Sequence, residues 1–300
     1  MKLITDIIER SLAHKAFSDF SDLEKAVLST NKVQSLFVAL ELALRAKTIG
    51  QAFSIGYRCA LQSLLPDLEQ NHWGAFCVTE KTGVHPKKLT TTVSKAGVIS
   101  GHKSFVSMAD VAKELIVIAR TEDSLNAERP VLKAVRVTLP HSGAEITMMP
   151  NMGMMPEVSH GVVELNNVQG QLLAGDGYMD FNKRFRSIED AHLLMAFTGL
   201  ILSKVLRHKL DDELIDDALV IVSALIAQDY SEGAFSVLHL NGINRSFLSL
   251  KSRFEKELDS ISGEFKNDWS RDSKIFTLAN KTRMLKRKKA LEYLIKYDHN

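Results

Sequence analysis

The sequence has few residues that could cross-link it and no long hydrophobic run. Its 300 residues include two cysteines, Cys59 and Cys77, which provide neither a disulfide framework nor a CxxC metal motif. We therefore expect a reducing, cytoplasmic environment. No stretch approaches about 18 consecutive apolar residues, so no membrane span is predicted. The N-terminal residues alternate charged with apolar types, unlike a signal peptide.

An excess of charge of one sign is also absent. The chain carries 38 basic and 36 acidic residues, which gives a formal net charge of +2. This even balance does not favour nucleic acid or a charged membrane as a partner. Hydrophobic residues make up 45% and charged residues 25% of the chain, as in ordinary globular proteins. A chain of this length is long enough for two or three domains.

The middle of the chain has the pattern of short strands separated by turns. Seven β-type runs alternate with turns rich in Gly, Pro or Lys: Ala75–Thr79, Thr90–Ser94, Ser104–Ser107, Leu115–Ala119, Val131–Leu139, Glu145–Met148 and Gly161–Val168. Short strands at such spacing are typical of a barrel or sandwich. We therefore predict an antiparallel β barrel or sandwich over residues 73–177.

Helical patterns flank this region. Residues 1–72 have apolar positions at helical spacing and predict a helical layer, with Gly50 and Gly56 as interruptions. Four helices are predicted after residue 178: Ile188–Lys209, Asp211–Tyr230, a third from Gly242 or Arg245 to Phe265, and Ser273–Tyr297. Four helices of this length indicate an antiparallel bundle. The predicted fold is α+β and multidomain, with domains at 1–72, 73–177 and 178–300.

Three motifs in the strand region indicate a known family. Phe-Cys-Val-Thr-Glu at 76–80 is followed by Gly-x-Lys-x-aromatic-x-Ser at 101–107 and by an apolar strand that ends in Ala-Arg-Thr at 119–121. Together with the order helices, strands, helices, these motifs resemble the acyl-CoA dehydrogenases. The segment from Met152 to Val168 is similar to the end of that family's middle domain, although Met155 and Asn167 replace its Arg and Asp. The chain resembles a short, divergent member.

The resemblance implies an FAD site in a cleft between the β domain and the bundle. The implied flavin-contacting residues are Phe76, Val78, Thr79, Phe105, Val106 and Ser107. In the family, the equivalent aromatic ring covers one flavin face, and backbone groups and hydroxyls hydrogen-bond the isoalloxazine edge. The residues alone leave another interpretation open, in which both phenylalanines are core residues and both hydroxyls are ordinary strand positions.

The loop after this first motif departs from the family pattern. Family members have Gly-Ala-Gly-Ser-Asp, which lets the backbone approach the flavin pyrophosphate. Here residues 81–86 keep one glycine, Gly83, while Val84 and Pro86 stiffen the loop. Lysines at 81, 87 and 88 offer charge in place of the lost backbone donors.

The resemblance also implies a catalytic base. Dehydrogenation of an acyl thioester needs a carboxylate for the α-proton while the β-hydrogen leaves as hydride. In most members this glutamate follows a segment like Arg271–Ile275, but the matching residue here is Asn280. Other members carry it early in the first bundle helix, where Glu189 is the candidate, followed by Asp190 in place of an Arg. Alternatively, Ser187-x-x-Asp190 resembles a capping box at the start of a helix. The helix dipole would then favour an acidic residue at position 189 without any catalytic role.

The function implied by the resemblance is FAD-dependent oxidation of acyl-CoA or another acyl thioester. It also implies a homodimer or homotetramer formed through the bundle and an electron-transfer flavoprotein as partner, with no metal. Two alternatives remain open. Asn280 and Asp190 favour a non-catalytic member that binds flavin or acyl thioester without turnover. The basic segment Arg283–Lys289 suits a helical interaction protein with an acidic partner.

Overall fold

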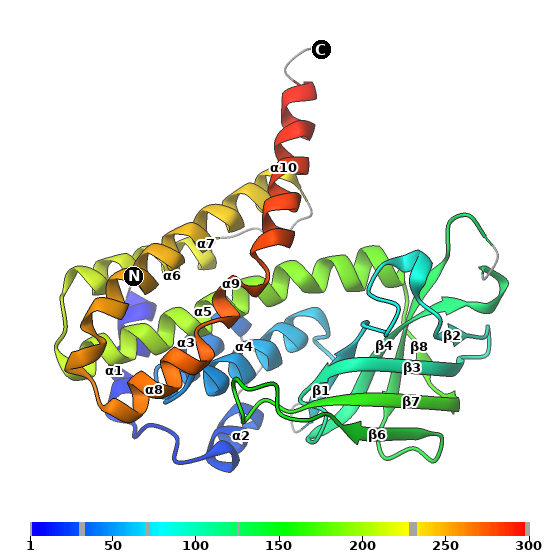
Figure 1. Ribbon diagram of the computed structural model, residues 1–300, viewed down its shortest axis with the longest axis horizontal. Coiled ribbons are helices and arrows are strands. Elements are labelled where there is room, and N and C mark those ends of the chain that lie inside the picture. Colours follow the sequence, from blue (N-terminus) through cyan, green and yellow to red (C-terminus); the bar gives the residue numbers. More distant parts are fainter. Residues whose placement is uncertain (1, 30–33, 70–71, 125–126, 228–232, 298–300) are drawn as a thin grey trace. The chain divides into compact units, whose positions relative to one another are not determined.

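In a computed structural model the chain forms two compact units. The structure describes residues 2–29, 34–69, 72–124, 127–227 and 233–297. The helical unit comprises residues 1–60, 153–155 and 187–300, and the β unit comprises residues 61–152 and 156–186. Figure 1 shows the elements of both. The division into three domains at 72/73 and 177/178 stays a prediction.

The β unit is built on one eight-stranded sheet. Its strands are β1 (Trp73–Cys77), β2 (Thr92–Val93), β3 (Val98–Ser107), β4 (Ala112–Thr121), β5 (Leu132–Thr138), β6 (Ala144–Met148), β7 (His160–Gln169) and β8 (Gln171–Leu172). Their order is β6-β7-β3-β2-β4-β5-β8, and β1 pairs with β4. Short 3-10 turns lie at Pro86–Lys88 and Glu122–Ser124. Each of the seven predicted runs overlaps a strand.

The sheet is mixed, whereas the sequence predicted only antiparallel pairing. β1 and β2 both pair with β4 in parallel, and the remaining pairs are antiparallel. A parallel pair requires a crossover connection. Between β1 and β4 that connection contains the antiparallel pair β2–β3. The expectation failed here because strands that are neighbours along the chain are not all neighbours in the sheet.

Strand β4 lies at the centre of the β core. Leu115, Val117 and Ala119 of β4 are fully buried, together with Val135 and Val137 of β5. Alternate residues of a strand face opposite sides of the sheet. The residues of β4 between them, at 116 and 118, are also fully buried. Both faces of β4 are therefore covered, which explains why its sequence is apolar without alternation.

The other elements are helices, as predicted for both ends of the chain. They are α1 (Lys2–Ala13), α2 (Phe20–Leu28), α3 (Ser35–Ala43), α4 (Ile49–Leu64), α5 (Arg184–His208), α6 (Glu213–Ile226), α7 (Ala234–Phe254), α8 (Gly263–Asp272), α9 (Ile275–Leu278) and α10 (Asn280–Tyr297). A π-helical turn, Gly177–Lys183, leads into α5, and a 3-10 turn, Glu255–Ser260, follows α7. Among the described residues, none of these helices combines the length and apolarity needed to cross a bilayer.

Two glycines expected to interrupt the N-terminal helices lie inside α4. Gly50 and Gly56 both belong to this helix. A Cβ atom on Gly56 would lie 2.9 Å from the carbonyl oxygen of His192 and 3.0 Å from a side-chain carbon of Leu193. Gly56 therefore permits a close approach of α4 to α5, which outweighs the usual cost of glycine inside a helix.

The third and fourth predicted bundle helices are wrong in their limits. The third was predicted to end at Phe265, but α7 ends at Phe254, and Ser262 caps a new helix by accepting a hydrogen bond from the N–H of Phe265. Phe254 packs against Phe265 and Trp269, with ring centroids 6.3 and 5.0 Å apart. These aromatic contacts favour a folded-back pair of helices. The fourth is divided into α9 and α10 at Ala279.

The second predicted bundle helix, Asp211–Tyr230, corresponds to α6. This helix begins at Glu213 and ends at Ile226. Residues 228–230 of the prediction lie outside the described residues. An acidic first turn, with Glu213 and Asp216, suits the N-terminal end of a helix dipole.

The two cysteines are free and belong to different units. Cys59 lies in the helical unit and Cys77 in the β unit. Both are buried, with 4% and 1% of their surface exposed. Burial raises the pKa of each thiol to about 12, because a thiolate in apolar surroundings loses its hydration. Neither thiol is therefore suited to act as a nucleophile.

Candidate functional site

A buried ion pair joins the two main motifs of the β unit. The side chains of Glu80 and Lys103 are fully buried, and the Lys103 Nζ lies 2.7 Å from Glu80 Oε1. The Glu80 carboxylate also accepts hydrogen bonds from the N–H groups of Thr90 and Thr91, and Lys103 donates to the carbonyl of Val78. Burial alone would raise the pKa of Glu80, but Lys103 and the Thr90 donors outweigh it and lower the pKa to about 2. The pair fixes β3 against the segments around Glu80.

Phe105 occupies a bulge in β3 that turns its ring outward. Lys103 pairs with Val163 and Val106 pairs with Gly161, so β3 has one extra residue between these positions. Phe105 has a φ of 54°, in the left-handed region that a non-glycine residue adopts only at an energetic cost. Its side chain is 50% exposed. This exposure contradicts the core interpretation of Phe105, and bulges of this kind often redirect a side chain beside a site.

The other aromatic and apolar residues of the predicted flavin site are more enclosed. Phe76 is half-buried and packs on Phe185, with ring centroids 4.4 Å apart. Val78 and Val106 are buried, and Val106 belongs to the β core. Only the backbone of these two valines is therefore suited to contact a ligand.

Two hydroxyl groups of the predicted flavin site have no partner in the described part of the chain. Thr79 and Ser107 are both half-buried, and neither hydroxyl is hydrogen-bonded to a described residue. Ser104 donates its backbone N–H to the carbonyl of Thr79 at 2.8 Å. Its own buried hydroxyl also lacks a partner among the described residues. Buried hydroxyls are normally hydrogen-bonded, so this cluster is chemically suited to a polar ligand edge.

The loop after Glu80 is closed by hydrogen bonds between its own residues. The N–H groups of Glu80 and Gly83 donate to each other's carbonyls. Lys87 N–H donates to the His85 ring at 3.2 Å, and Lys88 N–H donates to the His85 carbonyl at 2.8 Å. These four backbone donors are therefore not available to a phosphate. The side chains of Lys87 and Lys88 are exposed and carry the charge of this loop.

The helical unit contains a cavity of about 190 Å³. Its walls come from α4, α5, α7 and the segment from α9 into α10. Four phenylalanines form much of the apolar lining: Phe53, Phe197, Phe247 and Phe276. Phe276 meets Phe197 and Phe247 edge-on, with ring centroids 4.9 and 5.2 Å apart. An apolar cavity with a few polar groups is the usual form of a small-molecule site.

Glu189 lines this cavity and does not lie at a helix start. Helix α5 begins at Arg184, after the π-helical turn, and the cap of that turn is Asp176. Ser187 therefore lies inside the helix. The capping interpretation of Glu189 is wrong because the π-helical turn, which has no clear sequence signal, extends the helix toward the N-terminus.

The second position that the resemblance suggested for the base, Asn280, follows a residue that lines the same cavity. Ala279 is one of its lining residues, and the next residue, Asn280, begins α10. Glu189 and the residue before Asn280 thus border one cavity in the helical unit. Here Glu189 supplies a carboxylate and Asn280 does not.

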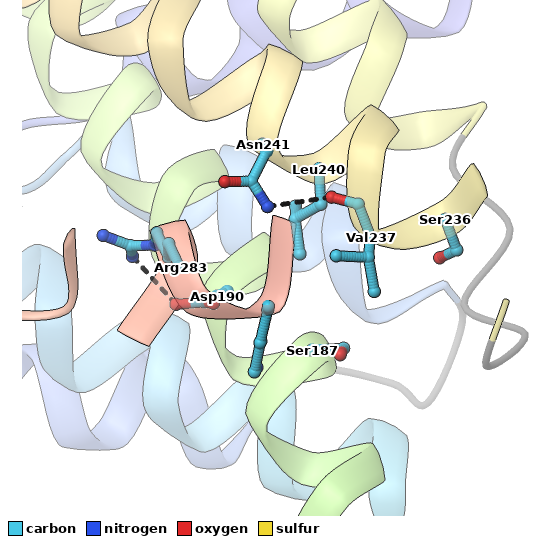
Figure 2. Close-up of a pocket in the computed structure, with 8 residues that line it drawn as sticks. Ser187, Asp190, Ser236, Val237, Leu240, Asn241 and Arg283 are labelled. Atoms are coloured by element: carbon cyan, nitrogen blue, oxygen red, sulfur yellow. Dashed lines mark hydrogen bonds and ion pairs between the residues drawn. The ribbon is translucent and has the colours of Figure 1, made fainter. Parts of the chain in front are cut away.

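Asp190 is paired with a residue that the sequence did not single out as a partner. Arg283 Nη2 lies 2.8 Å from Asp190 Oδ1, and the side chains are 14% and 18% exposed. Figure 2 shows this pair between α10 and α5, beside a second cavity of about 20 Å³. That volume is enough for about one water molecule. The two residues are 93 positions apart, so no local pattern could have linked them.

His192 is buried between two hydrogen-bond partners. Its Nδ1 lies 2.7 Å from the carbonyl of Ile188 and its Nε2 lies 2.8 Å from the hydroxyl of Ser35. Burial lowers the pKa of the His192 imidazole to about 4. A neutral ring with Nδ1–H donating to Ile188 accepts the Ser35 proton at Nε2. His192 therefore links α3 to α5, and its low pKa makes it a poor base.

Comparison with known proteins identifies the fold. No family model and no curated protein matches the sequence. Butyryl-CoA dehydrogenase from Megasphaera elsdenii matches with a TM-score of 0.68 and 15% identity, covering 97% of this chain and 96% of that chain. The electron transferring flavoprotein structure of Acidaminococcus fermentans matches with a TM-score of 0.71 and 12% identity, covering 97% of both chains. The structure of PigA with FAD and proline matches with a TM-score of 0.70 and 12% identity, and the match covers 97% of both chains.

These identities are too low to transfer an activity, and what they show is the architecture. The match extends over nearly the whole chain and includes the helices at both ends as well as the sheet. Among the described residues, no group of three or more His, Cys, Asp or Glu could hold a metal ion. The motifs, the order of the elements and the solved structures agree: this chain has the acyl-CoA dehydrogenase fold.

Proposed function

We propose that this protein is an FAD-dependent oxidoreductase that introduces a double bond between the α and β carbons of an acyl thioester. The observation that carries this proposal is Glu189, a carboxylate on the wall of a largely aromatic and aliphatic cavity of about 190 Å³. Such a cavity suits an acyl group, and the carboxylate suits removal of its α-proton.

The residues of the β unit fit a flavin ring. Phe105 offers an exposed aromatic face, and the hydroxyls of Thr79 and Ser107 offer hydrogen bonds for the polar ring edge. Bound FAD would supply the acceptor for the β-hydride. The loop after Glu80 fits the pyrophosphate less closely, because four of its backbone donors are already used. Its exposed lysines would hold the phosphates by charge.

Glu189 would accept the α-proton as general base. The neighbouring ion pair between Asp190 and Arg283 neutralises a second carboxylate at the same cavity. Glu189 lines the same cavity as this pair. The Asn280 side chain is an amide and cannot take up the proton.

Partners and location follow from the same proposal. The substrate would be acyl-CoA or another acyl thioester, and a homodimer or homotetramer in the reducing cytoplasm would be the working form. An electron-transfer flavoprotein would remove the electrons. The match to the structure named PigA with FAD supports this choice of cofactor.

A second candidate is a non-catalytic member that binds flavin or acyl thioester. Asn280 and the internally bonded loop after Glu80 favour it.

The test uses Glu189→Gln in FAD-loaded protein. Wild type incubated with FAD should retain a visible flavin spectrum, and butyryl-CoA without oxygen should bleach it. A general base contributes about 10²–10⁴ in rate, so Glu189→Gln should slow bleaching by that factor with unchanged FAD retention and melting temperature. Equal bleaching in the variant would contradict the role of Glu189.

Two further outcomes separate the candidate functions. An FAD-loaded wild type that no short acyl-CoA bleaches would favour the non-catalytic member. Protein that neither retains FAD nor melts at a higher temperature with excess FAD would overturn the flavoprotein proposal. Ligand present at 100 times its dissociation constant should stabilise the native state by about 2.7 kcal/mol.

A further inference from the structure

The last turns of α5 carry a lysine without an anionic partner. Lys204 is half-buried in the helical unit, and its Nζ lies 4.4 Å from the centroid of the Phe265 ring in α8. Among the described residues, this Nζ has no hydrogen-bond or ion-pair partner, and it is not one of the enclosed polar atoms. Water and small reagents therefore reach the Lys204 amine.

Two further cations act on Lys204. Arg207 follows one turn later on α5, and Lys47 comes from the segment between α3 and α4. Arg207 donates to the carbonyl of His14 at 3.2 Å, and Lys47 donates to the carbonyl of Ser18 at 3.4 Å. Neither forms an ion pair with a carboxylate in the described part of the chain. Lys47, Lys204 and Arg207 thus form a cation cluster without a paired anion.

Nearby acidic residues do not balance the cation cluster. The elements around it carry acidic residues at the start of α2, in α3 and in α8: Asp19, Asp22, Glu41, Glu264 and Asp268. None of them is among the charges that shift the pKa of Lys204. Burial, followed by the charges of Arg207 and Lys47, lowers this pKa to about 8. The Phe265 ring attracts the ammonium but has no net charge to offset two cations.

This environment activates the amine as a nucleophile. A lysine reacts in its neutral form, which desolvation and a neighbouring cation favour. At pH 7.5, a fall in pKa from 10.5 to about 8 raises the neutral fraction of Lys204 about two hundredfold. A less basic nucleophile is intrinsically slower, as the Brønsted relation for thiols shows. The net gain expected for Lys204 is therefore about tenfold, and the charges of Lys47 and Arg207 attract an anionic reagent.

We propose that Lys204 is a modification site at which an acyl thioester that carries phosphate groups acylates the amine. The Nζ lone pair attacks the carbonyl carbon, the carbon–sulfur bond breaks, and the leaving thiolate takes up the proton that the nitrogen loses. The products are an amide and a thiol, and nothing is oxidised or reduced. Lys47 and Arg207 attract the phosphates. The reaction uses neither FAD nor Glu189, so it does not depend on the proposed function.

The first experiment measures the acetylation rate of each lysine. The full chain is incubated with acetyl-CoA between pH 6.5 and 9.5, and initial rates are obtained by peptide mass spectrometry. At pH 7.5, Lys204 should be acetylated about tenfold faster than Lys209, an exposed lysine just after α5. The Lys204 rate should level off above about pH 8, whereas ordinary lysines, with a pKa of about 10.4, keep gaining reactivity. Lys103 is fully buried and should stay unlabelled while the protein is folded.

The second experiment tests the attraction of phosphate. S-acetyl-N-acetylcysteamine is a neutral thioester with the same acyl group and no phosphate. The ratio of the Lys204 rate to the Lys209 rate should be higher with acetyl-CoA than with this reagent. In 1 M NaCl the two ratios should become equal, because charges are then screened beyond about 3 Å.

Variants of the cation cluster connect the rate to its charges. Arg207→Gln should slow acetylation of Lys204 and move the levelling-off to higher pH. Lys209→Gln is the matched control, because it removes a cation near the same end of α5 that is not among the charges acting on Lys204. This control should leave the Lys204 rate unchanged. Lys47→Gln replaces Arg207→Gln if loss of the bond to the His14 carbonyl prevents folding.

The outcomes decide the inference separately from the proposed function. A Lys204 rate no higher than the Lys209 rate with acetyl-CoA at pH 7.5, or one that still rises steeply at pH 9.5, would overturn it. Equal rate ratios for the two thioesters at low salt would contradict the attraction of phosphate. Fast acetylation of Lys204 in protein that neither retains FAD nor bleaches it would support the inference while the proposed function fails.

Discussion

At the scale of single residues, Phe105 has two energetically unfavourable features, an exposed aromatic ring and a strained backbone. It is 50% exposed, and its backbone has a φ of 54°. Strained positions of this kind cost about 1–3 kcal/mol each and tend to persist where function requires them. The buried pair of Glu80 and Lys103 anchors the chain close to the bulge. Phe105 is therefore held in an unfavourable conformation by a rigid support.

Substitutions at Phe105 separate the effect of its ring on FAD binding from the effect of its backbone strain on stability. Phe105→Ala should weaken FAD retention and alter flavin fluorescence while changing the free energy of unfolding of the FAD-free protein by less than about 1 kcal/mol, since the ring is half exposed. Phe105→Gly should lose FAD equally but unfold at higher denaturant, because glycine adopts a positive φ at no steric cost. Denaturant unfolding with and without FAD measures both effects.

Leu115→Ala provides the contrast. Leu115 is fully buried in β4, so this variant should lose about 2–5 kcal/mol whether or not FAD is present. If Phe105→Ala lost about 3–5 kcal/mol equally in both conditions, Phe105 would have to be reassigned to the core despite its exposure.

Residue identities were predictable only where a motif carried them. Thr79, Phe105 and Ser107 were assigned by resemblance. Phe105 is exposed and the other two are half-buried, and their contact with a flavin stays a prediction. The pairing of Asp190 with Arg283 had no such signal, because the two residues lie 93 positions apart and meet only in the folded chain. The position of Glu189 was predicted, but its place within the helix was not.

At the scale of elements, the strands were predictable because Gly, Pro and Lys-rich turns separate them. Pairing was not, because the parallel contacts of β1 and β2 with β4 depend on the order of strands in the sheet. Helix limits failed for a different reason. The end of α7 is set by packing of Phe254 on Trp269 and not by a local breaker.

The contact of α4 with α5 gives a prediction at this scale. In Gly56→Ala the new methyl group would lie 2.9 Å from the His192 carbonyl oxygen. Overpacking of this kind costs about 1–3 kcal/mol, so the denaturant midpoint should fall. Gly242→Ala, inside α7 with nothing within 4 Å of its added Cβ, should raise stability by about 0.5–1 kcal/mol. A Gly56→Ala protein as stable as wild type would show that the helices can move apart without cost.

At the scale of the whole molecule, the fold is retained although identity to the solved structures is 15% or less. Apolar patterning with roughly correct volume is enough to specify a core, which accounts for one fold at such low identity. The loop after Glu80 and the residue Asn280 are the positions where the sequence departs from the pattern that the resemblance implies. This explains why the architecture could be predicted from the sequence while the chemistry of the site required side-chain positions.

The distribution of the two thiols makes each compact unit measurable by chemical labelling. The Cys59→Ala chain keeps only the reporter of the β unit, and the Cys77→Ala chain keeps only that of the helical unit. A rise in pKa from 9.0 to about 12 lowers the thiolate population roughly a thousandfold. We expect both thiols to react with a thiol reagent much more slowly than in urea-unfolded chain, because each buried thiol reacts when its unit opens and exposes it. A thiol that reacts as fast in native buffer as in urea would show that its unit opens readily.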